Sequence, residues 1–359
     1  MPSALPTVLY IPSIYTEHEP EEWESFSKFF NVLIYDCQTP EEFIKRLQPG
    51  GQYHTIDAIM RPSWLKAPPY QNHHLFRGQI VDHFPPSLKI IVSGGHGYDV
   101  VDVDRLTDRG IWFCNSPNTC TEATGEGSFP FENLIQANTV LYLILSAYRY
   151  FTFAEHCIRS GKYAESRRLG PLAEDPSGQI LGIIGLGHIG VAVAQRVQAI
   201  GMQVHYYSPT RKLTAERKLG GVVYHQSLES ILSVADCICL SCPYTPRTHH
   251  MLGTKEFSVM KNGVRIVNIA RGALIDEEAL VEAIDNGRVA AVGLDVHEHE
   301  PEVHPRLKEN YMTTLLPHIG VCSKTSWRNF ERNCRENLEA YFYGDGIPST
   351  PVNHIGRKN

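Results

Sequence analysis

The sequence predicts an α/β protein built on a doubly wound parallel sheet. Apolar segments of strand length alternate with helical segments along the 359 residues, as expected for parallel βαβ units with helices on both faces. One apolar segment, residues 180–184, leads directly into Gly185, Gly187 and Gly190. This GxGxxG spacing after a strand predicts a turn that binds the pyrophosphate of a dinucleotide.

Each glycine of this turn has its own expected role. Gly185 permits a tight turn, Gly187 lets the backbone approach phosphate, and Gly190 lets the following helix pack on the strand. A GxGxxG alone can be an ordinary glycine-rich turn, but here a strand precedes it and a helix follows, with the first N–H groups of that helix facing the anion. We expect the dinucleotide to contact the turn residues Gly185, Gly187, His188, Ile189 and Gly190.

The remaining elements follow from periodicity and from helix start signals. Before the glycine turn we expect strands at 7–11, 31–35, 58–60 and 88–92, helices at 20–30, 40–47 and 141–153, and a proline-rich loop at 62–69. After it we expect strands at 203–207, 237–241, 265–268 and 290–294, and helices at 191–200, 228–234, 277–286 and 325–343. The last helix is amphipathic, which allows it to return to the first part of the chain.

Length and charge narrow the class of protein. The chain is long enough for about two domains. Its net charge of −6 shows no basic footprint for nucleic acid. The first residues lack the features of a signal peptide, and the most apolar stretch, 140–147, is too short to span a bilayer. We therefore expect a cytoplasmic protein without membrane or nucleic-acid partners.

Three of the nine cysteines cluster as Cys237, Cys239 and Cys242. A metal site would need a second ligand pair at finger-like spacing, which does not follow. We interpret these cysteines as small apolar residues of a buried strand, and we expect neither a metal ion nor disulfides.

Three later segments carry polar groups, and two of these segments follow predicted strands. Arg271 comes after the strand at 265–268, a segment with a histidine and carboxylates (293–301) follows the next strand, and His318 lies in 316–320. Ligands bind at the carboxyl edge of open α/β sheets, where a guanidinium can grip a carboxylate and a histidine with a carboxylate can exchange protons. Each segment alone would more often be structural, but the three together after a nucleotide turn favour a catalytic site.

In these motifs the sequence resembles the D-isomer-specific 2-hydroxyacid dehydrogenases, especially glyoxylate/hydroxypyruvate reductases and fungal D-mandelate-dehydrogenase-like enzymes. The motifs that carry the resemblance are 185–190, 242–248, 268–272, 293–301 and 317–320, and the likeness runs from Lys89 to Asn353. It implies a Rossmann-type coenzyme domain (121–321) inserted in a smaller flavodoxin-like substrate domain (1–120), to which 322–359 returns. It also implies a homodimer, with the long helix from Val140 at the interface.

The resemblance implies roles for individual residues. Arg271 holds the 2-keto acid, His318 gives a proton to the developing alkoxide after hydride transfer to C2, and Glu300 orients His318 and favours its charged form. Glu298 lies nearby, but Glu300 directly precedes a proline, as in the family pattern. The substrate loop of the family corresponds to His96 and Gly97, and Arg61 is a weaker candidate for the same pocket.

The end of the predicted strand 203–207 indicates which dinucleotide is preferred. An NAD site usually offers a carboxylate there, but this strand ends in Ser208, followed by Arg211 and Lys212, which suit a 2′-phosphate. We therefore expect NADP(H) to be preferred and NAD(H) to be possible. Further expected dinucleotide contacts are Cys242, Pro243, Thr248, Ile269, Ala270, Arg271, Asp295, His318 and Gly320.

One segment departs from the family. Residues 125–136 intervene where relatives continue directly into the long helix. We consider two explanations, an unspliced intron and a tolerated surface loop. An alternative function also stays open, since corepressors of the same fold bind the dinucleotide with little turnover.

Overall fold

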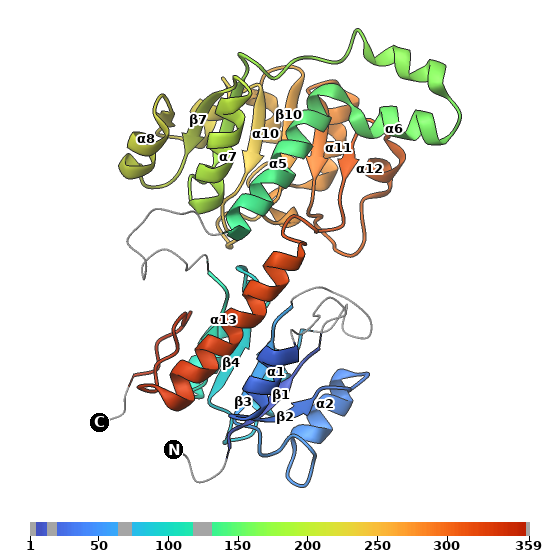
Figure 1. The fold of residues 1–359 in the computed structure, drawn as a ribbon. Coiled ribbons are helices and arrows are strands. Elements are labelled where there is room, and N and C mark those ends of the chain that lie inside the picture. The colour runs from blue at the N-terminus through green and yellow to red at the C-terminus, as the bar shows by residue number, and fades with distance from the viewer. Residues whose placement is uncertain (1–4, 13–19, 64–73, 118–130, 357–359) are drawn as a thin grey trace. The chain divides into compact units, whose positions relative to one another are not determined.

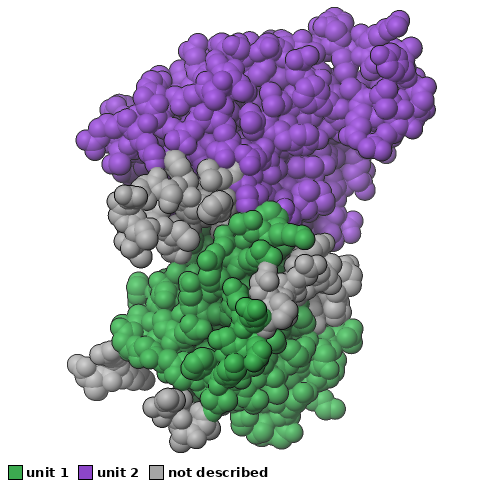
Figure 2. All heavy atoms as spheres, viewed as in Figure 1, with its two compact units in different colours: residues 1–125, 323–359 green, residues 126–322 purple. Residues whose placement is uncertain are grey.

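A computed structural model of the chain describes residues 5–12, 20–63, 74–117 and 131–356. The chain divides into two compact units, residues 1–125 with 323–359 (unit 1) and residues 126–322 (unit 2), coloured separately in Figure 2. Unit 1 is therefore discontinuous in sequence. Both units have a parallel sheet, which confirms the predicted α/β class.

The described residues of unit 1 form a five-stranded sheet in the order β2-β1-β3-β4-β5. All its pairings are parallel. This strand order is that of flavodoxin-like sheets, so the predicted architecture of this unit is confirmed. The strands are β1 (Thr7–Tyr10), β2 (Asn31–Ile34), β3 (Ala58–Arg61), β4 (Ile90–Ser93) and β5 (Trp112–Cys114).

Helices cover both faces of this sheet. Side chains of α2 and α4 pack in one apolar cluster, and those of α1 and α13 pack in the other. The helices are α1 (Pro20–Ser27), α2 (Pro40–Leu47), α3 (Gln79–Asp82), α4 (Val103–Asp108) and α13 (Lys324–Tyr343). Thr39 caps α2 by accepting a hydrogen bond from the N–H of Glu42, so the expected start of this helix is correct. α13 contacts β3 and β4, and the last helix of the chain thereby completes the core of unit 1.

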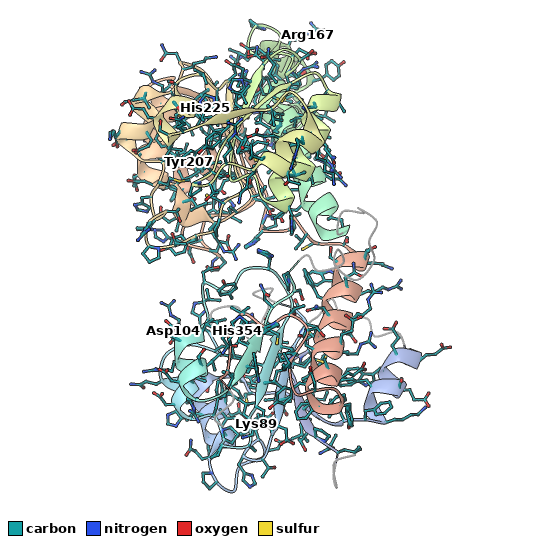
Figure 3. The ribbon with its side chains drawn as sticks, turned by 90° about the vertical axis from the view of Figure 1, so that its left-hand side faces the viewer. Lys89, Asp104, Arg167, Tyr207, His225 and His354 are labelled. Atoms are coloured by element: carbon teal, nitrogen blue, oxygen red, sulfur yellow. The ribbon has the colours of Figure 1, made fainter. Side chains whose placement is uncertain are left out.

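In the described part of unit 2, seven parallel strands lie in the order β12-β11-β10-β9-β6-β7-β8. The chain starts in the middle at β6, moves outward to β8, and crosses to β9 on the other side of β6, as in Rossmann sheets. Tyr207 ends β7 and pairs in register with His225 of β8; both are labelled in Figure 3. The strands are β6 (Ile180–Ile184), β7 (Gln203–Tyr207), β8 (Val223–His225), β9 (Cys237–Leu240), β10 (Val264–Asn268), β11 (Val289–Leu294) and β12 (Thr314–Leu315).

Each face of this sheet carries an apolar cluster. α5 and α7 cover one face (Figure 1), and α9, α10 and α11 contribute to the cluster on the other. Cys237 and Cys239 are fully buried beneath α5 and α7, in agreement with their interpretation as small apolar residues. The helices are α5 (Phe131–Arg149), α6 (Phe151–Arg159), α7 (His188–Ala199), α8 (Leu213–Leu219), α9 (Leu228–Leu232), α10 (Thr254–Val259), α11 (Glu277–Asp285) and α12 (Pro305–Glu309), with short 3₁₀ helices η1 (Tyr163–Leu169) and η2 (Gly272–Leu274).

The expected helix at 141–153 is wrong in both bounds. α5 begins at Phe131 and ends at Arg149, and a second helix starts at Phe151. Tyr150 separates them with φ +53, in the left-handed region, and its ring is buried beside Ala147 and Ala291. Packing of this ring therefore breaks a helix that the local sequence would continue. The sequence also missed several short elements, namely β5, β8, β12, α3, α4, α8, α10 and α12.

The segment that departs from the family lies partly outside the described residues. Residues 125–130 lie outside the described residues, and so does most of the expected proline-rich loop at 62–69. Residues 131–136 form the start of α5. Gln136 donates a hydrogen bond from Nε2 to the carbonyl of Ile269, at 3.0 Å. The last residue of the segment is thus bonded to the loop after β10. Among the described residues, no helix has both the length and the apolar character needed to cross a membrane.

Candidate active site

The glycine turn lies between β6 and α7, at the point where the strand order reverses. Gly185 has φ +102, and a Cβ on it would lie 2.8 Å from the backbone N of Cys242, which follows β9. A Cβ on Gly190 would lie 2.4 Å from the carbonyl oxygen of Gly185. Gly187 is exposed at the N-cap of α7, and a Cβ there would meet no protein atom. The first and third glycines are therefore required by the protein itself, whereas the second leaves open backbone at a helix N-terminus, where a pyrophosphate fits.

The end of β7 is arranged differently from what the sequence suggested. Ser208 is buried, and its Oγ accepts a hydrogen bond from the N–H of Leu186 in the glycine turn, at 3.0 Å. This hydroxyl therefore supports the turn. Lys212 is exposed, and its backbone N–H donates to the hydroxyl of Tyr206.

Arg211 has a carboxylate partner that the sequence did not reveal. Its Nε and Nη2 donate to Oε1 and Oε2 of Glu216 at 2.9 and 3.0 Å, and its Cζ lies 5.6 Å from the ring centroid of Tyr224. Glu216 comes from α8, one of the missed helices. The Arg211 side chain is still 56% exposed, so it remains accessible to an anionic ligand.

Arg271 is positioned by the turn after β10. The fully buried Asn268 donates from Nδ2 to the carbonyl of Arg271 at 2.8 Å and accepts from the N–H of Ala270 at 3.0 Å. The half-buried Arg271 is the residue that directly precedes the 3₁₀ helix η2. A Cβ on Gly272 would lie 1.9 Å from the carbonyl carbon of His297, so this turn packs directly on the loop after β11.

His318 and Glu300 form a hydrogen-bonded pair. Nδ1 of His318 lies 2.9 Å from Oε2 of Glu300, and Oε1 of Glu300 accepts from the N–H of His297 at 3.1 Å. The side chains are 21% and 18% exposed. Glu298 is bonded instead to His250, with Nε2 to Oε1 at 2.5 Å. The geometry therefore favours Glu300 as the partner of His318.

Asp295 holds the loop that carries His318. Its carboxylate oxygens accept from the N–H groups of Ile319 and Gly320, both at 2.8 Å, and its carbonyl accepts from the N–H of His318 at 2.7 Å. His318 itself has φ +57. Burial raises the pKa of the Asp295 carboxyl. The dinucleotide contact expected for Asp295 stays a prediction, and its partners within the protein are backbone groups of the His318 loop.

The other expected dinucleotide contacts lie in loops near the same edge of the sheet. Thr248 donates from Oγ1 to the carbonyl of Pro243 and accepts from the N–H of Thr245, so it stabilises the loop after β9. Cys242 is half-buried behind Gly185, and Ile269 is buried in the core.

The expected substrate residues of unit 1 lie at the end of β3 and in the loop after β4. Nε of Arg61 donates to the carbonyl of Ser63, its Cζ lies 5.7 Å from the ring centroid of Phe76, and burial lowers its pKa to about 10. His96 and Gly97 are exposed, and the carbonyl of His96 accepts from Nδ2 of Asn115. The exposed backbone of this loop is compatible with a site for an anion.

Known proteins resemble this chain in sequence and in fold. A model described as D-isomer specific 2-hydroxyacid dehydrogenase, NAD binding domain, matches residues 141–320. The 4-methyl-2-oxopentanoate reductase A of Aspergillus oryzae is 34% identical over 339 residues, 94% of each chain. The D-mandelate dehydrogenase structure of Rhodotorula graminis has a TM-score of 0.87 at 30% identity and covers 98% of this chain and 99% of its own. The NADPH-dependent glyoxylate/hydroxypyruvate reductase of Sinorhizobium meliloti has a TM-score of 0.76 at 27% identity, over 97% of each chain.

The fold and the glycine turn define an oxidoreductase that uses a nicotinamide dinucleotide and acts on a CH–OH group. The chain belongs to the family of D-isomer-specific 2-hydroxyacid dehydrogenases. The resemblance seen in the sequence motifs is thereby confirmed.

Proposed function

We propose that this chain reduces a small 2-keto acid reversibly to the D-2-hydroxy acid and favours NADPH. The observation that carries the proposal is the hydrogen-bonded pair of His318 and Glu300. These residues follow the adjacent strands β12 and β11, and Arg271 follows β10, the next strand in the sheet. Three groups far apart in sequence therefore come from neighbouring strand ends on the same edge as the glycine turn, where α/β sheets bind ligands.

Each side chain has a role that its chemistry allows. The nicotinamide, when bound, supplies a hydride to C2 of the keto acid. Arg271 grips the carboxylate and the carbonyl oxygen of the substrate through its guanidinium. His318 gives a proton to the C2 oxygen as negative charge develops there, and Glu300 stabilises the imidazolium before that transfer. In the reverse direction, His318 accepts the proton from the hydroxy acid.

The residues present fit a dinucleotide. The open backbone at Gly187 suits the pyrophosphate, and the exposed cations Arg211 and Lys212 at the end of β7 suit a 2′-phosphate. The NADPH-dependent relative from Sinorhizobium meliloti supports the preference for the phosphorylated form. Ser208 then contributes by supporting the turn.

The names of the relatives suggest the substrate class. They act on 4-methyl-2-oxopentanoate, mandelate, glyoxylate and hydroxypyruvate, all 2-keto or 2-hydroxy acids. We propose that the backbone of the His96–Gly97 loop in unit 1 binds the substrate carboxylate, with unit 1 as the substrate domain and unit 2 as the coenzyme domain. Arg61 is the further candidate in that pocket.

The test is a panel of keto acids with NADPH. We expect loss of NADPH absorbance with phenylglyoxylate, glyoxylate, hydroxypyruvate or 4-methyl-2-oxopentanoate, and a product of D configuration on chiral chromatography. A product of L configuration would contradict the proposal. Binding of NADPH without turnover of any member would favour the corepressor-like alternative.

We also propose that the protein is a homodimer and that it is cytoplasmic. Several large apolar side chains are exposed along α5, α6 and η1, namely Tyr142, Phe151, Ile158 and Tyr163, at 42%, 45%, 57% and 66%. Exposed apolar side chains grouped on neighbouring elements are typical of subunit interfaces. Light scattering should give the dimer mass, and a monomer mass would contradict this proposal. Imaging of the tagged protein in its own cell tests the location.

A further inference from the structure

His297 lies behind the proposed catalytic residues and contacts two of their segments. It is 5% exposed in the loop after β11. Its backbone N–H donates to Oε1 of Glu300 at 3.1 Å, and Nε2 of its ring lies 3.0 Å from the carbonyl oxygen of Leu316, two residues before His318. The buried His297 thus bonds both to the carboxylate of Glu300 and to the backbone segment that carries the imidazole of His318.

The hydrogen bonds define the tautomer of His297. A carbonyl oxygen only accepts, so Nε2 must carry a proton. Nδ1 is buried and has no hydrogen-bond partner among the described residues. The nearest acidic atom is Oε1 of Glu277, 3.9 Å away. Histidine here costs the protein an unpaired polar atom, so a ring without nitrogen would be expected if only packing mattered.

Hydrogen bonds and close backbone contacts surround His297. Glu277, the first residue of α11, is 5% exposed and exchanges two hydrogen bonds with Glu298. The N–H of Glu298 donates to Oε1 of Glu277 at 3.1 Å, and the N–H of Glu277 donates to Oε2 of Glu298 at 3.2 Å. Gly272 packs against the carbonyl of His297 on the other side. His297 therefore lies between α11 and the turn of Arg271, and its imidazole reaches the carbonyl of Leu316 in the His318 loop.

We propose that His297 is a positioning residue of the reaction, which sets the position of His318 relative to Glu300 through its bond to the Leu316 carbonyl. This inference rests on the proposed function, because it assigns the effect to the proton transfer by His318. His318 has a backbone with φ +57, and its segment is tied at Leu316 by His297 and at residues 318–320 by Asp295. Loss of the first tie lets the imidazole shift, and displacements of about 1 Å can cost 10²-fold in rate.

The experiment compares two substitutions that differ in whether they keep an N–H donor. His297→Gln keeps an N–H donor near the position of Nε2, whereas His297→Phe keeps the ring without a donor. We expect His297→Phe to lower kcat by about 10–100-fold with KM values for keto acid and NADPH within about three-fold, and His297→Gln to recover most of kcat. His299→Phe, at the exposed neighbouring histidine, is the control and should leave kcat unchanged.

Several outcomes would overturn the inference. It is wrong if His297→Phe keeps the kcat of the wild type, or if the Gln and Phe variants lose kcat equally. If His297→Phe does not fold, His297→Met, which fills the space without an N–H donor, takes its place. Turnover by the wild type and its loss in His318→Gln are measured alongside. If the wild type shows no turnover, or if His318→Gln keeps it, the proposed function is wrong. If the wild type turns over, His318→Gln does not, and His297→Phe behaves as the wild type, only this inference is wrong.

Discussion

Nδ1 of His318 lies 2.9 Å from Oε2 of Glu300, although the two residues are 18 positions apart in sequence. Because a carboxylate only accepts, Nδ1 carries a proton, and exchange with the substrate falls to Nε2. The pair is supported by backbone bonds to Glu300 from His297 and to Asp295 from the His318 loop.

Glu300→Gln should lower kcat by about 10–100-fold, because an amide does not stabilise the imidazolium that gives up the proton. The KM for NADPH should change little, since Glu300 is not among the residues proposed to hold the dinucleotide. Steady-state kinetics give both values. Glu302→Gln, at an exposed carboxylate nearby, is the matched control. Equal kcat values in the two variants would rule out this role of Glu300.

Gly187→Ala and Gly190→Ala should fail in different ways. A Cβ at Gly187 meets no protein atom, so this variant should fold with the stability of the wild type and bind NADPH at least about ten-fold more weakly. A Cβ at Gly190 would lie 2.4 Å from the carbonyl oxygen of Gly185, so that variant should melt at a lower temperature. Thermal melting and NADPH titration separate the two effects. Full NADPH affinity in Gly187→Ala would contradict the location of the pyrophosphate.

Arg211→Gln should raise the KM for NADPH about ten-fold, equivalent to ~1.4 kcal/mol, and leave that for NADH nearly unchanged. The reason is that the exposed guanidinium of Arg211 lies near the end of β7, where Glu216 and Tyr224 contact it. Arg217→Gln removes an equal charge from α8 and serves as the control. If the two variants discriminate between the dinucleotides equally, Arg211 does not recognise the 2′-phosphate.

A histidine pair should make unit 2 sensitive to acid. Nδ1 of His205 lies 2.9 Å from Nε2 of His225, and burial lowers the pKa of both, with further lowering of that of His205 by His225 and Lys261. The unfolded chain therefore binds more protons than the folded one as pH falls through about 6.5, so stability falls with it. When the pH is lowered from ~7.5 to ~5.5, the melting temperature of the wild type should fall further than that of His225→Gln. An equal loss in both proteins would contradict this prediction.

The sequence predicted the larger features of the fold because they leave residue-type signals. Buried parallel strands read as apolar runs, and the bounds of β6, β7 and α2 were predicted correctly. The break at Tyr150 could not be predicted, since the position has neither glycine nor proline and its left-handed backbone depends on packing beside Ala291. Very short elements such as β12 have too few residues for a periodic pattern.

The same distinction holds within the site. The sequence motifs pointed to His318, Glu300 and Arg271, and the structure places these residues after the neighbouring strands β12, β11 and β10. The hydrogen bonds of Asp295 and His297 were not predicted because their partners are backbone groups of the His318 loop, and a backbone partner imposes no residue type. The pairing of Arg211 with Glu216 depends on α8, which the sequence did not reveal.

The most direct test of the account is the kcat of His318→Gln with a keto acid that the wild type reduces. We expect kcat to fall about 10²–10⁴-fold, the usual contribution of a positioned general acid, while NADPH affinity stays within a few-fold of that of the wild type. A kcat within about three-fold of the wild-type value, with the same D product, would show that the proton comes from elsewhere and would contradict the central claim.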